Sequence, residues 1–560
     1  MAYSLLSTTK DVIGSLSSNQ SSFMIVFSSL ASILILLPIF GPKLFLFLGR
    51  IVGLCLQSNA GDRRRRLLSL IANDEQQWEA RENERRDSEE WENVERHTIE
   101  IPEPQETRDL EWDGIIGFFH PFCNAGGGGE RVLWAAVRAT QKTYPKAKCV
   151  IYTGDYEVDK TAILARVKNS FNINLHAPTV TFLYLTTRSW VLASSWPRFT
   201  LLGQSIGSLI LAWDAFGLMI PDIFVDTMGF AFSLALCKVL FPYVPTAAYV
   251  HYPTISIDML QSLDSKSCHG NQGIHAGKGA GVAGMAKKIY WLLFAKAYSV
   301  AGGSVDIVMT NSTWTLGHIT SLWGMWRRRF NKSPAVVIYP PVAVEEVERA
   351  VDISQSTEKQ RQPTLLYIAQ FRPEKNHQLI IRSFAAYKKR KSALSSAKLV
   401  LVGSIRDQSD SLRVYSLRLL ANELQIKDSV EFHIDASWPQ ILQWLTSASV
   451  GVNGMWNEHF GIGVVEYQAA GLITVVHNSG GPKEDIVTLV DGKPTGFHAS
   501  TITEYAQCFE EALGVPDADK VEMRQRARRS ADRFNEGKFI SSWNVQLDKL
   551  VKLHKQRQHG

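Results

Sequence analysis

The sequence predicts an α/β protein with two domains, each built on a parallel β-sheet flanked by helices. Short apolar runs typical of buried strands alternate with helical patterns from about residue 115 to residue 476. The alternation is interrupted once, by Pro340-Pro341 and the polar stretch 344–363, and then resumes. With 560 residues and 45% hydrophobic content, the chain is long enough to bury two such cores.

The N-terminal region predicts a membrane anchor. No charge occurs within residues 12–42, and residues 23–42 form an apolar run long enough to cross a bilayer as one helix. A cleaved signal peptide, the alternative, would have a basic start and a shorter apolar core. Lys43, Arg50 and the arginines at 63–66 follow the run, so the positive-inside rule places residues 1–22 in a lumen and the main body in the cytosol.

Residues 43–112 connect this anchor to the first domain. They are dense in charges of both signs from residue 72 onward, with tryptophans spaced among them. We expect a partly helical cytosolic tether, and a plain solvated linker fits the same composition.

Composition excludes some functions. The net charge is only +6, which gives no indication of a nucleic-acid partner. The six cysteines are scattered, without a Cys-x-x-Cys pair or two histidines at ligand spacing. That pattern argues against a structural zinc site and favours a reducing compartment.

The first domain is expected over residues 113–343. Between its first strand and first helix lies a glycine-rich turn made of Gly126, Gly127, Gly128, Gly129 and Glu130. Four glycines at such a turn let the backbone approach a ligand and offer free amides, so the turn is a candidate loop for an acceptor or a diphosphate. The pattern is not Gly-x-Gly-x-x-Gly, which leaves a nicotinamide site weakly supported, and a loose flexible turn is the other interpretation.

Two more features of this domain bear on function. His251 ends a strand and precedes Tyr-Pro, at the sheet edge where parallel sheets meet their ligands, so it is a catalytic candidate as well as an ordinary structural histidine. The segments 199–220 and 229–244 are unusually apolar helical patterns. They predict either buried core helices or a surface that dips into the bilayer interface.

The second domain is expected over residues 344–535, and the last helix, 536–560, is expected to pack back on the first domain. Arg372 and Lys375 flank a turn after the first strand of this domain. At the carboxyl edge of a sheet, two cations suit a diphosphate leaving group. A surface basic pair is the alternative.

The most informative stretch follows the buried strand 448–452. Glu458 lies in a loop, Phe460-Gly461-Ile462-Gly463 starts a helix, and Glu466 lies inside that helix. Unpaired amides at a helix start favour an anion, and the two carboxylates are at most ~12 Å apart along the axis. We therefore expect Glu458 at a transferred sugar, the 460–463 backbone at a diphosphate and Glu466 at a ribose. An ordinary amphipathic helix with a solvated Glu is the alternative.

These residues resemble the donor-site signature of the GT-B retaining glycosyltransferases of family 4, which have two Rossmann-like domains facing a cleft. The resemblance covers roughly residues 113–545. Longer strings are similar to the dolichol-pathway α-1,2-mannosyltransferases of the endoplasmic reticulum. They are Phe118-Phe-His-Pro-Phe-Cys-Asn-Ala-Gly-Gly-Gly-Gly-Glu-Arg-Val-Leu-Trp134, His251-Tyr-Pro-Thr-Ile-Ser256, Thr310-Asn-Ser-Thr-Trp314, Gln370-Phe-Arg-Pro-Glu-Lys-Asn-His377 and Asn457-Glu-His-Phe-Gly-Ile-Gly-Val-Val-Glu466.

The resemblance implies a retaining enzyme that takes mannose from GDP-mannose and adds the fourth and fifth mannoses to dolichyl-diphosphate-linked Man3GlcNAc2. It implies no metal and no cofactor, a single-pass protein of the endoplasmic reticulum membrane, and other dolichol-pathway mannosyltransferases as candidate partners. The catalytic roles fall on Glu458, His251, Lys375 and Arg372. One departure concerns the arginine that the family places five residues before the lysine, because this position is Gln370 here.

Two other functions are compatible with the same residues. One is another membrane-bound GT-B enzyme, such as an earlier dolichol-pathway mannosyltransferase or an N-acetylglucosaminyltransferase of the glycosylphosphatidylinositol pathway. The other is a non-catalytic scaffold subunit, which the intact set of Glu458, Glu466, Arg372 and Lys375 argues against.

Overall fold

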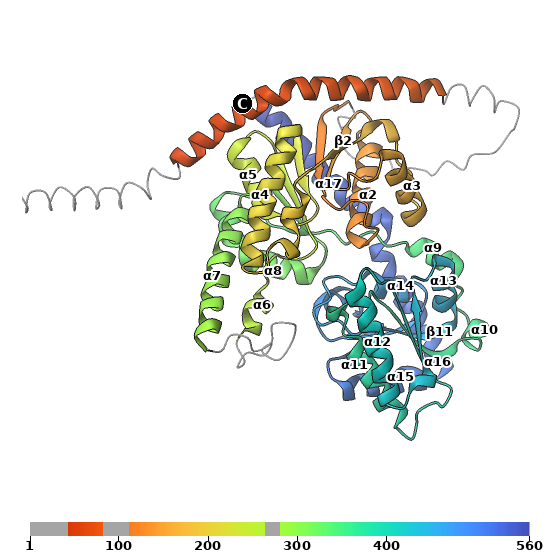
Figure 1. The fold of residues 1–560 in the computed structure, drawn as a ribbon. Coiled ribbons are helices and arrows are strands. Elements are labelled where there is room, and N and C mark those ends of the chain that lie inside the picture. The colour runs from red at the N-terminus through yellow and green to blue at the C-terminus, as the bar shows by residue number, and fades with distance from the viewer. Residues whose placement is uncertain (1–42, 82–110, 264–280, 559–560) are drawn as a thin grey trace, which may run out of the picture.

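The computed structural model describes residues 43–81, 111–263 and 281–558, which form two α/β domains (Figure 1). The expected transmembrane helix 23–42 and the N-terminus before it lie outside the described residues, as do residues 82–110 of the tether. The N-terminal helix Lys43–Arg81 runs along the side of the first domain that faces away from the second (Figure 1).

In the described part of the chain, the first domain has a seven-stranded parallel sheet with the order β3-β2-β1-β4-β5-β6-β7. Its strands are β1 (Ile115–Phe119), β2 (Lys148–Thr153), β3 (Val180–Tyr184), β4 (Ile223–Asp226), β5 (Thr246–Val250), β6 (Ile307–Thr310) and β7 (Val336–Val337). Its helices are α2 (Gly128–Thr143), α3 (Lys160–Phe171), α4 (Thr200–Leu218), α5 (Ala231–Leu240), α6 (Ile257–Ser262), α7 (Gly281–Gly303) and α8 (Thr313–Arg329).

The second domain repeats this plan with a six-stranded parallel sheet in the order β10-β9-β8-β11-β12-β15. Its strands are β8 (Gln362–Ile368), β9 (Lys398–Gly403), β10 (Val430–Ile434), β11 (Ala448–Asn453), β12 (Ile473–His477) and β15 (Gly496–Ala499), with a small hairpin of β13 (Leu489–Val490) and β14 (Lys493–Pro494). Its helices are α9 (Val344–Ala350), α10 (Gln355–Glu358), α11 (His377–Lys388), α12 (Gln408–Glu423), α13 (Trp438–Ser447), α14 (Ile462–Ala469), α15 (Ile502–Gly514) and α16 (Asp517–Ala531).

The predicted pair of Rossmann-like parallel-sheet domains is therefore confirmed. In each sheet the strand order reverses beside the first strand, between β1 and β4 in one domain and between β8 and β11 in the other. Ligands of such sheets bind at the carboxyl ends of the strands next to this reversal. The carboxyl edges of the two sheets face each other, because Asn457 after β11 reaches Asp258 after β5.

The C-terminal helix α17 (Glu536–Gln558) crosses back to the first domain. Phe539, Trp543 and Leu547 belong to the same buried cluster as Phe118 of β1 and Trp134 of α2. The rings of Phe118 and Trp543 stack with centroids 6.4 Å apart. This apolar contact joins the end of the chain to the first core.

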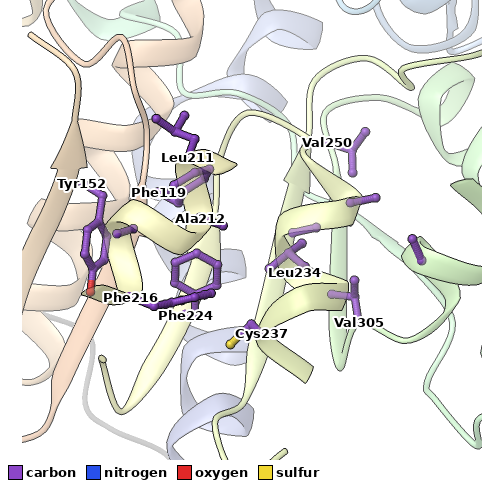
Figure 2. Close-up of a cluster of buried hydrophobic side chains, with 14 of the residues drawn as sticks. Phe119, Tyr152, Leu211, Ala212, Phe216, Phe224, Leu234, Cys237, Val250 and Val305 are labelled. Atoms are coloured by element: carbon purple, nitrogen blue, oxygen red, sulfur yellow. The ribbon is translucent and has the colours of Figure 1, made fainter. Parts of the chain in front are cut away.

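The other face of the first sheet is covered by α4 and α5. Figure 2 shows Phe216 of α4 and Leu234 of α5 directed into one core with Phe119 and Phe224 of the sheet. The apolar segment 229–244 is thus a core helix, and the alternative that it dips into a bilayer is not supported. Segment 199–220 is a core helix on one side only, because the other side of α4 remains exposed.

The described part of the tether is a docked helix. A Cβ on Gly53 would come within 2.0 Å of the Leu240 carbonyl oxygen, so the helix backbone lies directly against the end of α5. Ala60 belongs to the first core, and Arg64 forms a 2.7 Å salt bridge with Asp222 at the start of β4. Arg63, which donates to the Gly217 carbonyl oxygen, and Arg64 therefore help to hold the helix on the domain.

A buried arginine of α16 links three segments of the second domain. Arg524 of α16 is fully buried and forms two hydrogen bonds with the Glu358 carboxylate, at 2.7 and 3.0 Å. Its remaining nitrogen donates to the carbonyl oxygens of Ser449 and Gly471, at 2.8 and 2.7 Å. One guanidinium thus joins three segments that are far apart in the sequence.

Replacing Arg524 with methionine leaves the Glu358 carboxylate buried without its cation, and we expect a loss of about 3–5 kcal/mol in the free energy of unfolding. Thermal unfolding of the purified protein in detergent measures this loss. The matched control is Arg529→Met on the exposed side of the same helix, where little change is expected. Equal unfolding temperatures for the two variants would contradict the assignment.

Candidate active site

The centre of the site is an ion pair between two loops of the second domain. Lys375 ends a 3-10 turn after β8, and Glu458 lies in the loop after the neighbouring strand β11. The Lys375 Nζ atom lies 2.5 Å from Glu458 Oε2, which also accepts from Asn453 Nδ2 at 3.4 Å. Burial alone would raise the pKa of Glu458, but the Lys375 charge holds it below its ordinary value. The Glu458 carboxyl is therefore ionised at neutral pH.

A glycine turn after β12 fixes the position of Glu458. The Gly481 amide donates to the Glu458 carbonyl oxygen at 2.8 Å. At Gly480, φ is +70° and a Cβ would lie 2.3 Å from the same oxygen. Only glycine combines this backbone conformation with such a close approach, so the Gly480-Gly481 turn determines how far Glu458 projects from the sheet.

The helix after Glu458 begins later than expected. The sequence predicts a start near Phe460, but α14 begins at Ile462, with Gly461 as its N-cap at φ 104°. Phe460 is almost fully buried between Tyr339 and Phe534, so its side chain is a core residue and only its backbone faces the loop. The first amides of the helix, those of Ile462 and Gly463, have no partner one turn earlier within it and remain suited to an anion.

Glu466 lies one turn into α14 and faces the other domain. Burial raises the pKa of Glu466 to about 7, a rise that the nearby charge of Arg131 opposes and that of Glu346 supports. Arg131 belongs to α2 of the first domain, and its Nε is buried without a hydrogen bond among the described residues. Arg131 is thus close enough to Glu466 for its charge to act across the two domains, which the sequence analysis did not anticipate.

The glycine-rich turn of the first domain lies opposite α14. A Cβ on Gly128 would come within 2.6 Å of Ile462 Cδ1, so the turn and the helix start face each other closely. Glu130 has a different task from the one expected. Its carboxylate accepts from the Gly127 amide at 2.5 Å and so caps the N-terminus of α2. The same carboxylate lies 3.5 Å from His120 Nε2. Backbone from Gly126 to Gly129 therefore offers the ligand-facing surface.

His251 lies behind this turn at the end of β5. Its Nε2 is buried without a hydrogen-bond partner among the described residues, and a Cβ on Gly129 would lie 3.7 Å from it. Burial lowers the pKa of His251 to about 4, so the ring is neutral at pH 7. A neutral imidazole with one unpartnered nitrogen can either accept a hydrogen bond from a hydroxyl at this point or donate one to it.

Arg372 is less central than Lys375. Its guanidinium lies 3.7 Å from Glu374 and is about one third exposed. Gln370, at the position where the family has an arginine, accepts a hydrogen bond from Arg406 at 3.1 Å. Arg406 is thus a third cation near this turn, after Arg372 and Lys375. The sequence analysis missed it because it follows a different strand, β9.

Several contacts between the domains were also missed. His459, next to Glu458, stacks on Tyr252 with ring centroids 4.1 Å apart, and Asn457 Nδ2 donates to Asp258 at 2.6 Å. Asp485 accepts from the Thr313 amide at 2.9 Å. These residues follow strands of the two opposing sheets. In the sequence, only the strings His251-Tyr-Pro and Asn457-Glu-His indicated that these loops belong to the site.

Within residues 43–81, 111–263 and 281–558, no group of three or more His, Cys, Asp or Glu side chains is placed to hold a metal ion. The cations at the carboxyl edge of the second sheet are instead protein side chains, Lys375 and Arg372.

Two Rossmann-like domains with opposed carboxyl edges, an acid–lysine pair and a free helix start define the GT-B class of glycosyltransferases. Solved structures agree on the fold. A trehalose-phosphate synthase from Burkholderia xenovorans superposes with a TM-score of 0.55 at 12% identity, covering 79% of this chain and all of that one. A glycosyltransferase from Rickettsia africae gives 0.50 at 14% identity, covering 79% and 99%.

Sequence comparison identifies the family. Residues 113–323 match the family model for the ALG11 mannosyltransferase N-terminus, and residues 348–531 match that for glycosyl transferases group 1. Proteins named GDP-Man:Man(3)GlcNAc(2)-PP-Dol alpha-1,2-mannosyltransferase are similar over most of their length. The Neurospora crassa protein is 60% identical over 94% of this chain and 97% of its own, and the human protein is 43% identical over 78% and 87%. The chain belongs to this mannosyltransferase family.

The Glu466 carboxyl predicts a pH dependence of stability. Its pKa is 4.5 in the unfolded chain and about 7 in the fold, so the folded protein favours the protonated form. Stability from this group is therefore greatest below pH 4.5 and declines as the pH rises to about 7. Buried histidines such as His251, whose pKa is lowered, act in the opposite direction in both proteins, so the test is the difference between the two. From pH 5 to 8 the unfolding temperature of the wild type should fall relative to that of Glu466→Gln.

The exposed Glu423→Gln variant on α12 serves as the control and should follow the wild type. A gap between Glu466→Gln and the wild type that stays constant with pH would show that the carboxyl does not titrate in this range.

Proposed function

We propose that this chain is a retaining α-1,2-mannosyltransferase that moves mannose from GDP-mannose to dolichyl-diphosphate-linked Man3GlcNAc2 and adds its fourth and fifth mannoses. The substrates come from the names of its relatives. The observation that carries the mechanism is the 2.5 Å Lys375–Glu458 pair, which lies at the sheet edge opposite His251 and the glycine-rich turn.

The donor would lie along the amino end of α14. The diphosphate is a dianion or more, and the unpaired amides of Ile462 and Gly463 with Lys375 and Arg372 provide its hydrogen bonds and positive charge. Glu466, one helical turn away, is in reach of the ribose hydroxyls. The charge of Arg131 in the first domain favours the ionised carboxylate of Glu466, although burial outweighs this effect and raises the pKa to about 7. Either form of the carboxyl can accept a hydrogen bond from a ribose hydroxyl.

Cleavage of the bond between mannose and phosphate leaves positive charge on the sugar and negative charge on GDP. Lys375 would stabilise the departing diphosphate, and this change of partner would release Glu458 to bind the mannose hydroxyls. Without the donor, the two side chains neutralise each other, which keeps both charges satisfied in a half-buried site.

Retention follows from front-face attack. A double-displacement route needs two carboxyl groups about 5 Å apart across the scissile bond. Glu458 is paired with Lys375 on the donor side, while Glu130 caps its own helix, so neither is placed as a nucleophile. The acceptor hydroxyl would attack from the side of the leaving phosphate, which takes its proton, and His251 would orient that hydroxyl through Nε2.

The location follows from the same assignment. A dolichyl acceptor is a membrane lipid, and the run 23–42 followed by Lys43, Arg50 and Arg63–Arg66 favours a single-pass protein of the endoplasmic reticulum with its catalytic body in the cytosol.

Removing either member of the pair should abolish transfer. We expect Lys375→Ala and Glu458→Ala to lower kcat by at least ~10²-fold, because each loses charge stabilisation that develops at bond cleavage. Transfer of mannose from GDP-mannose to lipid-linked Man3GlcNAc2 is the assay, with UDP-N-acetylglucosamine as the competing donor. Arg382→Ala, an exposed cation on α11, is the control and should retain wild-type turnover.

Wild-type turnover in both pair variants would reject the assignment. Transfer of N-acetylglucosamine in place of mannose would leave the assignment of the site intact but show that the donor is not GDP-mannose.

The protein cations make a divalent metal unnecessary for leaving-group stabilisation in this proposal. Transfer should therefore be unchanged after EDTA treatment and dialysis. An activity that is lost with EDTA and restored by Mn²⁺ or Mg²⁺ would contradict this point while leaving the donor site in place.

A further inference from the structure

The two residues on either side of Glu458 both contact the first domain. Asn457 Nδ2 donates to the Asp258 carboxylate of α6 at 2.6 Å. The ring of His459 stacks on that of Tyr252, with centroids 4.1 Å apart and planes at 29°. Glu458 itself faces back to its own domain, where its carboxylate is paired. The first domain therefore holds this loop at both neighbours of the carboxylate.

The ring of His459 belongs to a small aromatic cluster. Trp314, at the start of α8, stacks with His459 at 5.7 Å between ring centroids, with planes at 23°. Tyr252 and Trp314 are nearly parallel, at 9° with centroids 6.2 Å apart. Stacked rings of this kind restrict both the position and the tilt of the ring that they contact. His459 therefore has little freedom to move while the two domains are in contact.

The surface of the first domain that receives the loop is itself well packed. His318, one turn after Trp314 on α8, meets the Trp314 ring edge to face with centroids 4.2 Å apart. The Nε2 atom of His318 lies 3.4 Å from the Asp258 carboxylate. Trp314 and His318 are each only 7% exposed. The acceptor of Asn457 and the rings that contact His459 are therefore parts of one packed unit.

The backbone of Asn457 has an uncommon conformation. Its φ is +52°, in the left-handed region that asparagine adopts more readily than most residues. Such a conformation persists where the surrounding contacts hold it. Here the contacts are the hydrogen bond to Asp258 and one from the Asn457 amide to the Ser479 hydroxyl of the second domain, at 2.8 Å. Asn457 is thus fixed from both domains at once.

The His459 ring contributes its flat shape and no charge. Burial lowers the pKa of His459 to about 4, against the opposing effect of the Glu458 charge, so the ring is neutral at pH 7. Lys375 therefore remains the cation that pairs with Glu458. A phenyl ring could fill the same place on Tyr252, whereas it could not take over a role in proton transfer.

We propose that Asn457 and His459 are positioning residues, through which the first domain sets where the Glu458 carboxylate lies in the cleft. The carboxylate would then reach the transferred sugar only while the two domains are together. That Glu458 acts on a sugar rests on the proposed function, whereas the hold of the first domain on this loop rests on the contacts alone.

Steady-state kinetics test the positioning. His459→Ala removes the stacked ring, and Asn457→Gly removes the hydrogen bond but keeps a residue that adopts positive φ readily. We expect each variant to lower kcat roughly 10- to 100-fold, because a displaced carboxylate no longer meets the sugar. The KM for GDP-mannose should change by less than about twofold, since the contacts proposed for diphosphate and ribose are untouched. His459→Phe keeps a flat ring and should restore most of the lost kcat.

The matched control breaks a different contact between the domains. Thr313, at the start of α8, donates to Asp485 through its hydroxyl as well as its amide. Thr313→Ala removes the hydroxyl and should leave kcat close to that of the wild type. An equal loss of kcat in Thr313→Ala and His459→Ala would overturn the proposal, because domain association alone would then explain it. Wild-type kcat in both loop variants, or a His459→Phe variant as slow as His459→Ala, would also overturn it.

A double-mutant cycle separates positioning from an effect elsewhere in the protein. If His459 acts through Glu458, His459→Ala should cause no further loss of kcat in the Glu458→Gln background. Losses that multiply fully in the double variant would contradict this.

Hydrogen exchange measures the hold on the loop without any turnover. In the full chain in detergent, the amides of residues 456–460 should exchange at least roughly threefold faster in His459→Ala and Asn457→Gly than in the wild type or Thr313→Ala. Unchanged exchange would overturn the proposal, whereas a wild type that transfers no mannose would count against the proposed function alone. Unfolding temperatures show whether each variant is folded, and Asn457→Gly decides the question if His459→Ala is not.

Discussion

The ion pair between Lys375 and Glu458 is the interaction on which the site depends. Its two members are 83 residues apart in the chain and meet because β8 and β11 are neighbours at the point where the strand order reverses. Parallel strands bring all their carboxyl ends to one edge, so loops from distant parts of the sequence converge there. The Gly480-Gly481 turn after β12 then fixes the height of Glu458 above that edge.

The charges around this pair form a consistent pattern across the cleft. The second domain carries the cations and the helix start that suit a diphosphate. The first domain provides a neutral His251 and a turn whose one acid, Glu130, is already bonded. Asn457 donates to Asp258 and His459 stacks on Tyr252, so the residues on either side of Glu458 join the domains. These contacts link the loop that carries Glu458 directly to the first domain.

Much of this could be predicted from the sequence. The strands could be predicted because each is a short apolar run followed by a turn. Glu458 and Lys375 could both be assigned to the site because they follow strands of one sheet. Their ion pair was not predicted, because each was assigned to a different part of the donor. β15 escaped because Gly496-Phe-His-Ala499 is short and carries little pattern. Phe460 was assigned to the donor, but its ring fills the space between Tyr339 and Phe534. Contacts such as His459 with Tyr252 depend on how the two domains meet, and the periodicity of a single helix carries no information about that.

A structure of the protein with GDP bound would test the central claim most directly. The account predicts the diphosphate within hydrogen-bonding distance of Lys375 Nζ and of the Ile462 and Gly463 amides, with the ribose at Glu466 and the Lys375–Glu458 contact opened. GDP elsewhere in the cleft, or an unbroken Lys375–Glu458 pair beside a bound diphosphate, would contradict it.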